Sequence, residues 1–407
     1  MKLFIFVGTG RYEPVTYRWS NREKHTKFFS EALVEWLQPQ TTCVMLTDTA
    51  RQHQNWQELK PLLQQRTEIR EVHIPDGKSE QELWQIFQCL ADAVEPKDEL
   101  AFDITHAFRS LPLLTLLAMA YLKQVKEVQI RHLLYGAYEA RENEIAPVFD
   151  LTPFAELLDW LTAAKMFITT GNASELAQLL EQIQNEAWRE QLVDQSPRHL
   201  KGLAKALTEV SHHFLLSRVP RLAESVQKLQ SRLESSDGAR AEARVWVPPL
   251  IPLLEHITET YRPFADDDLR TQAKLIAWYK EHGHIIQAMT LAREWIISYR
   301  IHQQGKDWRC DRNARDRMEQ YLNEHAKCDP LWSKVRDLRN DLAHCGFGRA
   351  KGEVLKPGSI RDTAHKVVEE ILKMSEDIDR TVQSDIISAA HRETKCDGET
   401  QSEDERA

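Results

Sequence analysis

The first 150 residues alternate between short apolar runs and amphipathic segments. KLFIFVG, at residues 2–8, is an apolar run that ends in glycine, as a buried parallel strand often does. Four later runs have a similar character: CVMLTD, EIREVHIP, ELAFDIT and VQIRHLLYG. The segments between them include KFFSEALVEWL, SEQELWQIFQCLADAV and the strongly apolar LPLLTLLAMAYLK. Repeated β-α units predict an α/β domain over residues 1–150, with a mostly parallel sheet covered by helices on both faces.

From Leu151 onward the strand pattern disappears and helical periodicity takes over. The first helix is expected to stop at Gly171, and Ser235–Gly238 has the composition of a turn. We therefore expect an all-α connector over residues 151–240 and a second all-α domain over residues 241–390. Residues 391–407 are polar and charged without hydrophobic periodicity, which favours a disordered tail.

Length and composition limit the class of protein. A chain of 407 residues can hold two or three domains, and its net charge of −9 offers no broad basic surface for tight duplex binding. No run of eighteen apolar residues is present, and the first residues lack the basic start and cleavage site of a signal peptide. The six cysteines are scattered without a CxxC pair, as expected for reduced thiols. We expect a cytoplasmic protein with no membrane contact.

A polar motif, Arg339-Asn340-Asp341-Leu342-Ala343-His344, lies late in the helical region. If residues 331–344 are helical, Arg336, Asn340 and His344 form an i, i+4, i+8 row with Arg339 beside it. The apolar positions of the same segment should face a core: Val335, Leu338 and Leu342.

This row combines a fixed positive charge, an amide and a group that titrates near neutral pH. RNA cleavage by its own 2′-hydroxyl needs a base, and donors that stabilise charge on the phosphorane. Arg339, Asn340 and His344 are therefore the candidate catalytic residues. The alternative is a solvated helix face, because Arg-x4-His also occurs by chance.

One set of residues contains the side chains that bind zinc: Cys310, His325, Cys328 and His344. Their spacing is irregular, which favours ordinary helix-packing residues over zinc ligands. We expect no metal and no cofactor.

Two polar loops follow predicted strands of the α/β domain. The first contains Gly8, Thr9, Gly10 and Arg11. It lacks the third glycine of a dinucleotide fingerprint, but its backbone N–H groups can still approach a phosphate. The alternative is a tight βα turn.

The second loop follows ELAFD and carries five candidate ligand-binding residues: Asp103, Thr105, His106, Arg109 and Ser110. Asp103 and Thr105 could instead cap the next helix. Capping does not explain His106 and Arg109, so polar phosphate recognition is the better interpretation. Ligands bind at the carboxyl ends of strands in such sheets.

These loops also carry a family resemblance. GTGRY with the nearby VTYRW, and DITHAFRSLP, closely resemble the DxTHG-motif proteins of type III CRISPR systems. Ala107 stands where those proteins usually have glycine. The late R-N-x-x-x-H resembles the HEPN ribonuclease signature of the same proteins.

The resemblance implies a sensor coupled to an effector. The amino-terminal domain would be a Rossmann-like CARF domain that dimerises around one cyclic oligoadenylate, and paired HEPN domains would form one RNase site. The expected protein is a homodimeric endoribonuclease of antiviral defence, activated by cyclic oligoadenylate. It would cleave single-stranded RNA without metal, leaving a 2′,3′-cyclic phosphate and a 5′-hydroxyl.

Two alternatives stay open. The protein could be a ligand-responsive regulator or scaffold with a catalytically silent HEPN domain. The sensor could also cleave its own ligand with help from Thr9, His106 or Ser110. The sequence does not select a ring size or an RNA sequence preference.

Overall fold

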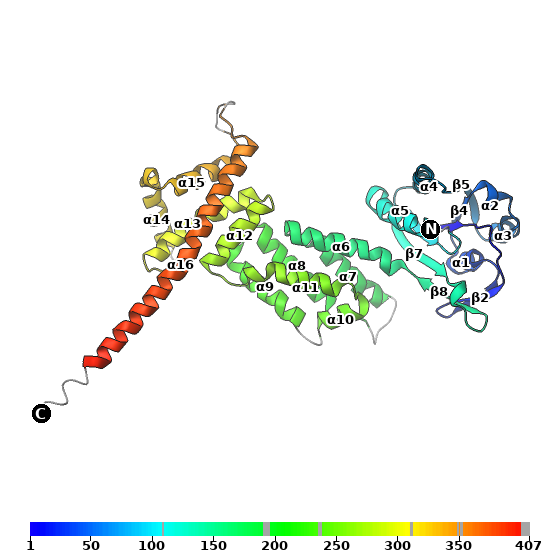
Figure 1. Cartoon of the computed structure of the whole chain (residues 1–407), viewed down its shortest axis with the longest axis horizontal. Coiled ribbons are helices and arrows are strands. Elements are labelled where there is room, and N and C mark those ends of the chain that lie inside the picture. Colours follow the sequence, from blue (N-terminus) through cyan, green and yellow to red (C-terminus); the bar gives the residue numbers. More distant parts are fainter. Residues whose placement is uncertain are drawn as a thin grey trace. The chain divides into compact units, whose positions relative to one another are not determined.

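The computed structural model describes residues 1–107, 110–189, 196–234, 238–309, 312–347, 350 and 353–399, with side chains described as far as residue 378. The chain forms two compact units, Met1–Trp160 and Leu161–Ala407 (Figure 1). The first unit contains the sheet and the second is helical.

An eight-stranded sheet organises the first unit, in the order β3-β2-β8-β7-β6-β1-β4-β5. Five of its neighbouring pairs are parallel, while β2–β3 and β7–β8 are antiparallel. The strands are β1 (Lys2–Phe6), β2 (Val15–Trp19), β3 (Arg22–Thr26), β4 (Thr41–Leu46), β5 (Glu68–His73), β6 (Glu99–Asp103), β7 (Gln129–Gly136) and β8 (Ile145–Asp150).

Helices cover both faces of this sheet. They are α1 (Phe29–Leu37), α2 (Asp48–Gln52), α3 (Gln54–Gln64), α4 (Glu80–Asp92) and α5 (Leu111–Lys126), with a short 3₁₀ turn, η1 (Tyr138–Ala140). Alternate residues of β1 point to opposite sides: Leu3 and Ile5 join the core beneath α1 and α3, while Phe4 and Phe6 join the core beneath α4 and α5. The predicted mostly parallel α/β domain with helices on both faces is confirmed.

The segments named from the sequence do not include five elements of this unit: the strands β2, β3 and β8 and the helices α2 and α3. β2 and β3 form a hairpin whose second strand, REKHT, has no apolar alternation. β8 contains Pro147 and pairs with β7 on one side and β2 on the other. β4 ends at Leu46, and the Thr47 hydroxyl accepts from the Ala50 N–H to start α2. An edge strand such as β3 carries charged side chains that prevent pairing with other chains. It therefore lacks the apolar alternation by which a strand is recognised in a sequence.

The second unit is built from helices, and α6 (Thr152–Thr170) leads into it from the first. The others are α7 (Ser174–Arg189), α8 (Leu200–Leu215), α9 (Val219–Glu234), α10 (Ala239–Trp246), α11 (Leu250–Tyr261), α12 (Leu269–Glu281), α13 (Ile285–Gln303), α14 (Arg312–Glu324), α15 (Pro330–Ala343) and α16 (Pro357–Glu399), with short turns η2 (Arg262–Phe264) and η3 (Ala326–Cys328). The predicted all-helical carboxyl-terminal region is confirmed.

The structure groups residues 161–407 in one compact unit. The division of this helical region near residue 240 stays a prediction. α16 continues to Glu399, through residues 391–399 where the composition favours disorder; residues 400–407 lie outside the described part. As expected, α6 ends at Gly171, whose φ of 76° is a left-handed conformation that glycine adopts readily. No described helix is long and apolar enough to cross a membrane.

Candidate ligand pocket and ribonuclease motif

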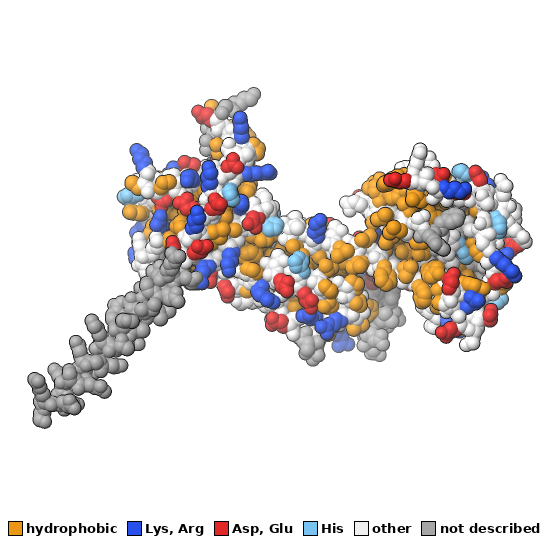
Figure 2. Space-filling model, viewed as in Figure 1, with side chains coloured by type: hydrophobic (Ala, Val, Ile, Leu, Met, Phe, Trp, Pro, Cys, Tyr) orange, Lys and Arg blue, Asp and Glu red, His pale blue; other side chains and the backbone are white. Residues whose placement is uncertain are grey.

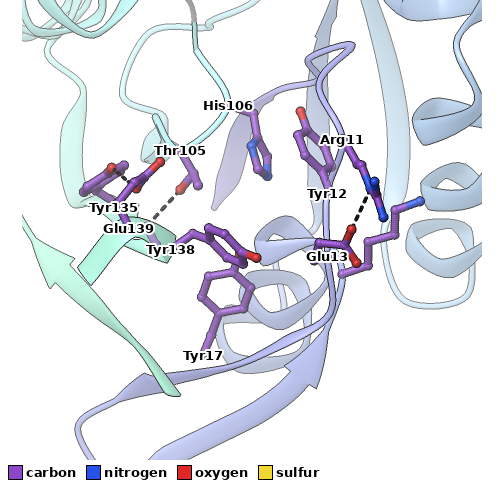
Figure 3. Close-up of a pocket in the computed structure, with 11 residues that line it drawn as sticks. Arg11, Tyr12, Glu13, Tyr17, Thr105, His106, Tyr135, Tyr138 and Glu139 are labelled. Carbon is purple, nitrogen blue, oxygen red and sulfur yellow. Dashed lines mark hydrogen bonds and ion pairs between the residues drawn. The ribbon is translucent and has the colours of Figure 1, made fainter. Parts of the chain in front are cut away.

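A pocket of about 170 Å³ lies where β1, β6 and β7 end and the loops after them begin. The sequence reasoning placed a ligand at this edge of the sheet. Figure 3 shows Thr105, Tyr135 and Glu139 on one side of the cavity and Arg11 with Glu13 on the other. The lining residues are Arg11, Tyr12, Glu13, Tyr17, Lys27, Thr105, His106, Tyr135, Gly136, Tyr138 and Glu139.

Asp103 anchors the loop after β6 and does not line the cavity. Its side chain is fully buried. One carboxylate oxygen accepts from the Ser30 hydroxyl of α1 at 2.8 Å, and the other accepts from the Thr105 N–H at 2.9 Å. The Thr105 hydroxyl in turn accepts from the Gly136 N–H at 2.9 Å. Asp103 thus ties β6, α1 and the end of β7 together, and α5 takes Ser110 rather than Asp103 or Thr105 as its N-cap.

The glycine loop after β1 is held from below by Asn55 of α3. The Asn55 side-chain amide donates to the carbonyl oxygens of Gly8 and Gly10 at 3.0 and 2.9 Å. The Gly8 N–H donates to the Tyr12 hydroxyl at 2.9 Å. A Cβ on Gly8 would lie 2.6 Å from that hydroxyl, so glycine permits the close approach. The Gly8 N–H that we expected to meet phosphate is therefore already bonded within the loop.

His106 lies flat against Tyr12, with ring centroids 4.0 Å apart and planes 19° from parallel. Its Nε2 is shielded from solvent and has no hydrogen-bond partner in the part of the chain that the structure describes. Burial lowers the pKa of the imidazole below its ordinary value, against the opposing pull of the Asp103 and Glu139 carboxylates. Burial likewise raises the pKa of Tyr12 to about 12. The pair presents a neutral aromatic wall at neutral pH.

The residues on the other side of the pocket were not predicted from the sequence. Tyr135 donates its hydroxyl to the Glu139 carboxylate at 2.9 Å, and Tyr138 lies beside them in η1. Tyr17 enters from β2, and burial raises the pKa of its phenol. An available signal was the pair of tyrosines in YGAYEA, Tyr135 and Tyr138, at the end of β7.

The cationic groups near the cavity have acidic partners. Arg11, at 90% side-chain exposure, pairs with Glu13 at 2.6 Å. Lys27 pairs with Glu58 at 2.6 Å and lies 5.2 Å from the centre of the Phe28 ring. The Arg11–Glu13 pair is open to solvent, where such pairs contribute little stability, so Arg11 can turn towards an anionic ligand at small cost. The Lys27–Glu58 pair is half-buried.

The nine predicted ligand residues separate into three groups. Arg11, Thr105 and His106 line the cavity, and Gly8 and Asp103 shape its loops. The others include the exposed loop positions Thr9, Gly10 and Ser110. Arg109 lies outside the described residues.

The predicted motif helix is present as α15. It starts at the N-cap Asp329, whose carboxylate accepts from the Trp332 N–H at 3.0 Å and from Arg300 at 2.9 Å. Trp332, Val335 and Leu338 are buried, and the periodicity predicted this for Val335 and Leu338. Leu342, which was predicted to face the same core, is only half-buried.

The polar row lies on the other face of α15. His344 is the C-cap; it is exposed, and its N–H donates to the Asn340 carbonyl at 3.0 Å. Asn340 is also exposed and its side-chain oxygen accepts from Arg339 at 3.2 Å. The Arg339 Nε is buried with no hydrogen-bond partner among the described residues. Arg336 pairs with its neighbour Asp337. One face thus offers an imidazole, an amide and a guanidinium.

The alternative metal residues are not gathered in the described part of the chain, where no three His, Cys, Asp or Glu side chains form a group that could hold an ion. His325 stacks on Tyr321, with ring centroids 4.2 Å apart. Cys310 lies outside the described residues.

Comparison with known proteins bears on both units. Residues 2–139 match the family described as "CRISPR system endoribonuclease Csx1, CARF domain". The amino-terminal unit matches a CARF domain. Residues 156–264 match "CRISPR-associated protein MJ1674, second domain". Neither of these two matches reaches α15.

A curated relative agrees with these matches. The chain is 26% identical over 298 residues to the CRISPR-associated protein MJ1674 of Methanocaldococcus jannaschii. The aligned region covers 69% of this chain and 43% of MJ1674. The chain thus spans less than half the length of this relative. Together the matches show that the amino-terminal unit is similar to the CARF domain of Csx1-type CRISPR proteins and that the following helices are similar to part of MJ1674.

Proposed function

We propose that this protein is a homodimeric, metal-independent endoribonuclease that cyclic oligoadenylate activates in type III CRISPR defence. The observation that carries the proposal is one chain holding a CARF-type pocket at the strand ends and an Arg-Asn-x3-His face on α15. The substrate would be single-stranded RNA, and the Arg-Asn-x3-His face on α15 would cleave it.

The pocket suits a nucleotide in shape and chemistry. Tyr12 with His106, and Tyr135 with Tyr138, offer flat aromatic surfaces on which adenine can stack. Arg11 and Lys27 supply cations that reach solvent and can meet phosphate. The Thr105 hydroxyl, which accepts from the Gly136 N–H, adds a donor to the lining of the pocket.

Cleavage would use the 2′-hydroxyl of the RNA as the nucleophile. His344 takes the 2′ proton as the 2′ oxygen bonds to the adjacent phosphorus, and the bond from phosphorus to the 5′ oxygen breaks. The leaving 5′ oxygen receives a proton from the partner's His344. Arg339 stabilises the charge on the phosphorane and Asn340 orients it by hydrogen bonding. The products are a 2′,3′-cyclic phosphate and a 5′-hydroxyl.

Activation would follow from a difference in affinity between two states. The ring favours the dimer arrangement in which both α15 helices face one RNA strand, because it binds that arrangement more tightly. A silent HEPN domain would bind the same ring without cleaving RNA.

An RNase assay separates these possibilities. The full chain is incubated with labelled single-stranded RNA, with a chelator, and with each of several ring sizes. The proposal expects cleavage that one ring size stimulates and the chelator leaves intact, with 2′,3′-cyclic phosphate ends. His344→Ala should lose cleavage and keep its fold and ring affinity. Ring binding by the wild-type chain without RNA cleavage would establish the silent regulator instead.

A further inference from the structure

A groove of about 280 Å³ lies at the end of α13, within the second unit. It is bounded by the start of α12, by the segment between α13 and α14, and by one residue of α16. Neither the candidate ligand pocket nor the polar face of α15 shares a residue with it. We call it the Trp308 groove, after the one aromatic side chain that lines it together with four basic ones: Arg270, His302, Lys306 and Arg309.

Trp308 and Arg309 form a flat surface in the groove. The guanidinium carbon of Arg309 lies 4.4 Å from the centre of the Trp308 ring. One Arg309 nitrogen donates to the Asp267 carbonyl oxygen at 2.6 Å, and Nε lies 3.8 Å from the Asp267 carboxylate. The Arg309 side chain is nevertheless 46% exposed. Unpaired RNA bases stack on aromatic rings and on guanidinium planes, so this pair offers a surface for one base.

The cations of the groove outnumber its carboxylates, and both carboxylates are engaged with the backbone. Asp268, the N-cap of α12, accepts from the Thr271 N–H at 2.7 Å. Asp307 accepts from the Arg309 N–H at 3.0 Å.

Lys306 is exposed and has an uncharged partner. Its amine donates to the side-chain oxygen of Gln304 at 3.2 Å, and no carboxylate pairs with it among the residues that the structure describes. A cation of this kind can neutralise an RNA phosphate and release the counterions bound there. The groove thus combines a stacking surface with an open positive charge.

The wider surface fits a single strand better than a duplex. Over helices α12 to α15, Figure 2 shows Lys and Arg side chains with acidic side chains between them. The whole chain has a net charge of −9. Duplex binding depends on many phosphate contacts and therefore on a broad basic surface. A single strand is held by aromatic side chains and local cations, which is what the groove provides.

Helix α13 connects the groove to the motif helix. Arg300, two residues before His302, pairs at 2.9 Å with Asp329, the N-cap of α15. An α-helix rises about 1.5 Å per residue, so His344 lies roughly 20 Å beyond Asp329. A ligand that occupies the groove and also reaches His344 must therefore be a strand of several nucleotides.

We propose that the Trp308 groove binds single-stranded RNA several nucleotides away from the bond that is cleaved. One base stacks on Trp308 and Arg309, and Lys306 contacts a neighbouring phosphate. The groove raises the affinity for longer RNA and takes no part in the cleavage step. This inference rests on the proposed function, because it assigns a second contact to the same substrate.

RNA binding tests the groove separately from cleavage. In a full chain that carries His344→Ala, the RNA stays intact. Trp308→Ala in this background should weaken binding of a single strand of roughly 16 nucleotides at least fivefold, since stacking of one base contributes a factor of about 5 to 150. Trp308→Phe should keep most of the affinity. Trp188→Ala is the matched control, because Trp188 is an exposed tryptophan (49%) in α7.

Salt dependence tests the phosphate contact with a substitution that removes no buried group. Each phosphate neutralised on a single strand contributes about 0.7 to the slope of log K against log salt. Lys306→Ala should therefore reduce the magnitude of this slope by about 0.7. Lys205→Ala removes an exposed lysine of α8 and should leave the slope unchanged.

Cleavage kinetics test where the groove acts. With His344 intact, Trp308→Ala should raise KM at least fivefold for RNA of roughly 16 nucleotides and leave kcat unchanged. The KM for RNA of about 4 nucleotides should not change, because such a strand is too short to reach the groove from His344.

Unchanged RNA affinity in Trp308→Ala and an unchanged salt slope in Lys306→Ala would overturn the inference. An equal loss of affinity in Trp188→Ala would do the same. So would adenosine monophosphate that binds as tightly as the long strand and loses as much affinity in Trp308→Ala, since the groove would then be a mononucleotide site. If RNA affinity falls as expected but the wild-type chain cleaves no RNA with any ring, the groove stands and the proposed function is refuted. Ring-stimulated cleavage that Trp308→Ala leaves unchanged at every RNA length has the reverse meaning.

Discussion

Asp103→Ala should weaken the amino-terminal unit severely, although the carboxylate does not line the pocket. Its two oxygens accept from the Ser30 hydroxyl and the Thr105 N–H in a site with no exposed surface. A hydrogen bond to a charged group contributes about 1.5–3 kcal/mol. Losing both should lower the free energy of unfolding by about 3–6 kcal/mol, a large part of the usual 5–15 kcal/mol of a domain.

Asp103→Asn is the matched control. The amide keeps one acceptor oxygen for the Thr105 N–H, and its NH₂ group can donate to the Ser30 hydroxyl when that hydroxyl turns. The expected loss is therefore smaller, about 1–2 kcal/mol. Because Asp103→Asn keeps the side-chain volume, its loss measures the contribution of the carboxylate, and the further loss in Asp103→Ala measures the removed hydrogen bonds and volume together.

The assay must report on one unit, because two compact units need not unfold together. Amide hydrogen exchange read by mass spectrometry gives the opening free energy of β1 and β6 separately from that of the helices. The interpretation fails if Asp103→Ala leaves exchange in these strands unchanged and abolishes ring binding. Asp103 would then contact ligand directly, as the sequence first suggested.

Further substitutions test other residues. Gly136→Ala puts a Cβ 2.7 Å from a buried aromatic ring and should cost about 1–3 kcal/mol in urea unfolding. Gly10→Ala meets nothing nearer than 3.7 Å and should change stability by less than about 0.5 kcal/mol; equal effects would refute the packing account. Since burial lowers the pKa of His106, its contribution to stability should be present above about pH 6.5 and be lost as the pH falls below it. His106→Phe should reduce the fall in the free energy of unfolding below about pH 6.5. An unchanged fall would contradict its assignment to His106. Asp329→Ala should raise amide exchange in the first turn of α15 by loss of a cap worth about 1 kcal/mol, and Asp329→Asn should largely retain it.

The sequence predicted the centre of the sheet and missed its edge, for a physical reason. β1, β4 and β6 are buried on both faces, so they appear as continuous apolar runs. β3 is mostly exposed and carries Arg22, Glu23 and Lys24, which no hydrophobic pattern reveals. Its pairing with β2 is a tertiary fact that local periodicity does not encode.

The residues that line the pocket were predicted only in part. Thr105 and His106 follow a strand whose end could be recognised, so their place at the carboxyl edge followed from sheet topology. Tyr17 reaches the pocket only because β2 lies beyond β8 in the strand order, an arrangement that the unpredicted hairpin creates. The hydrogen bond between Asp103 and Ser30 could not be predicted, because the two residues lie 73 positions apart in the chain. The predicted contact of Asp103 with a ligand stays a prediction.

On α15 the sequence predicted the burial of Val335 and Leu338 and the exposure of His344, since a regular helix fixes which side chains share a face. It did not predict the ion pair between Asp329 and Arg300 of α13, because these residues lie 29 positions apart in the chain. Whether two such faces meet across a dimer axis depends on assembly, which a single chain does not encode locally.

The most direct test of the central claim, that the amino-terminal pocket controls cleavage by α15, is the rate of RNA cleavage as a function of added cyclic oligoadenylate. The account predicts a rate that rises and saturates with one ring size. Arg109→Ala should reach the same maximum at a roughly 10- to 150-fold higher ring concentration, the equivalent of about 1.5–3 kcal/mol. His344→Ala should bind the ring and cleave nothing. A ring that binds without changing the rate, or full cleavage by His344→Ala, would contradict the account.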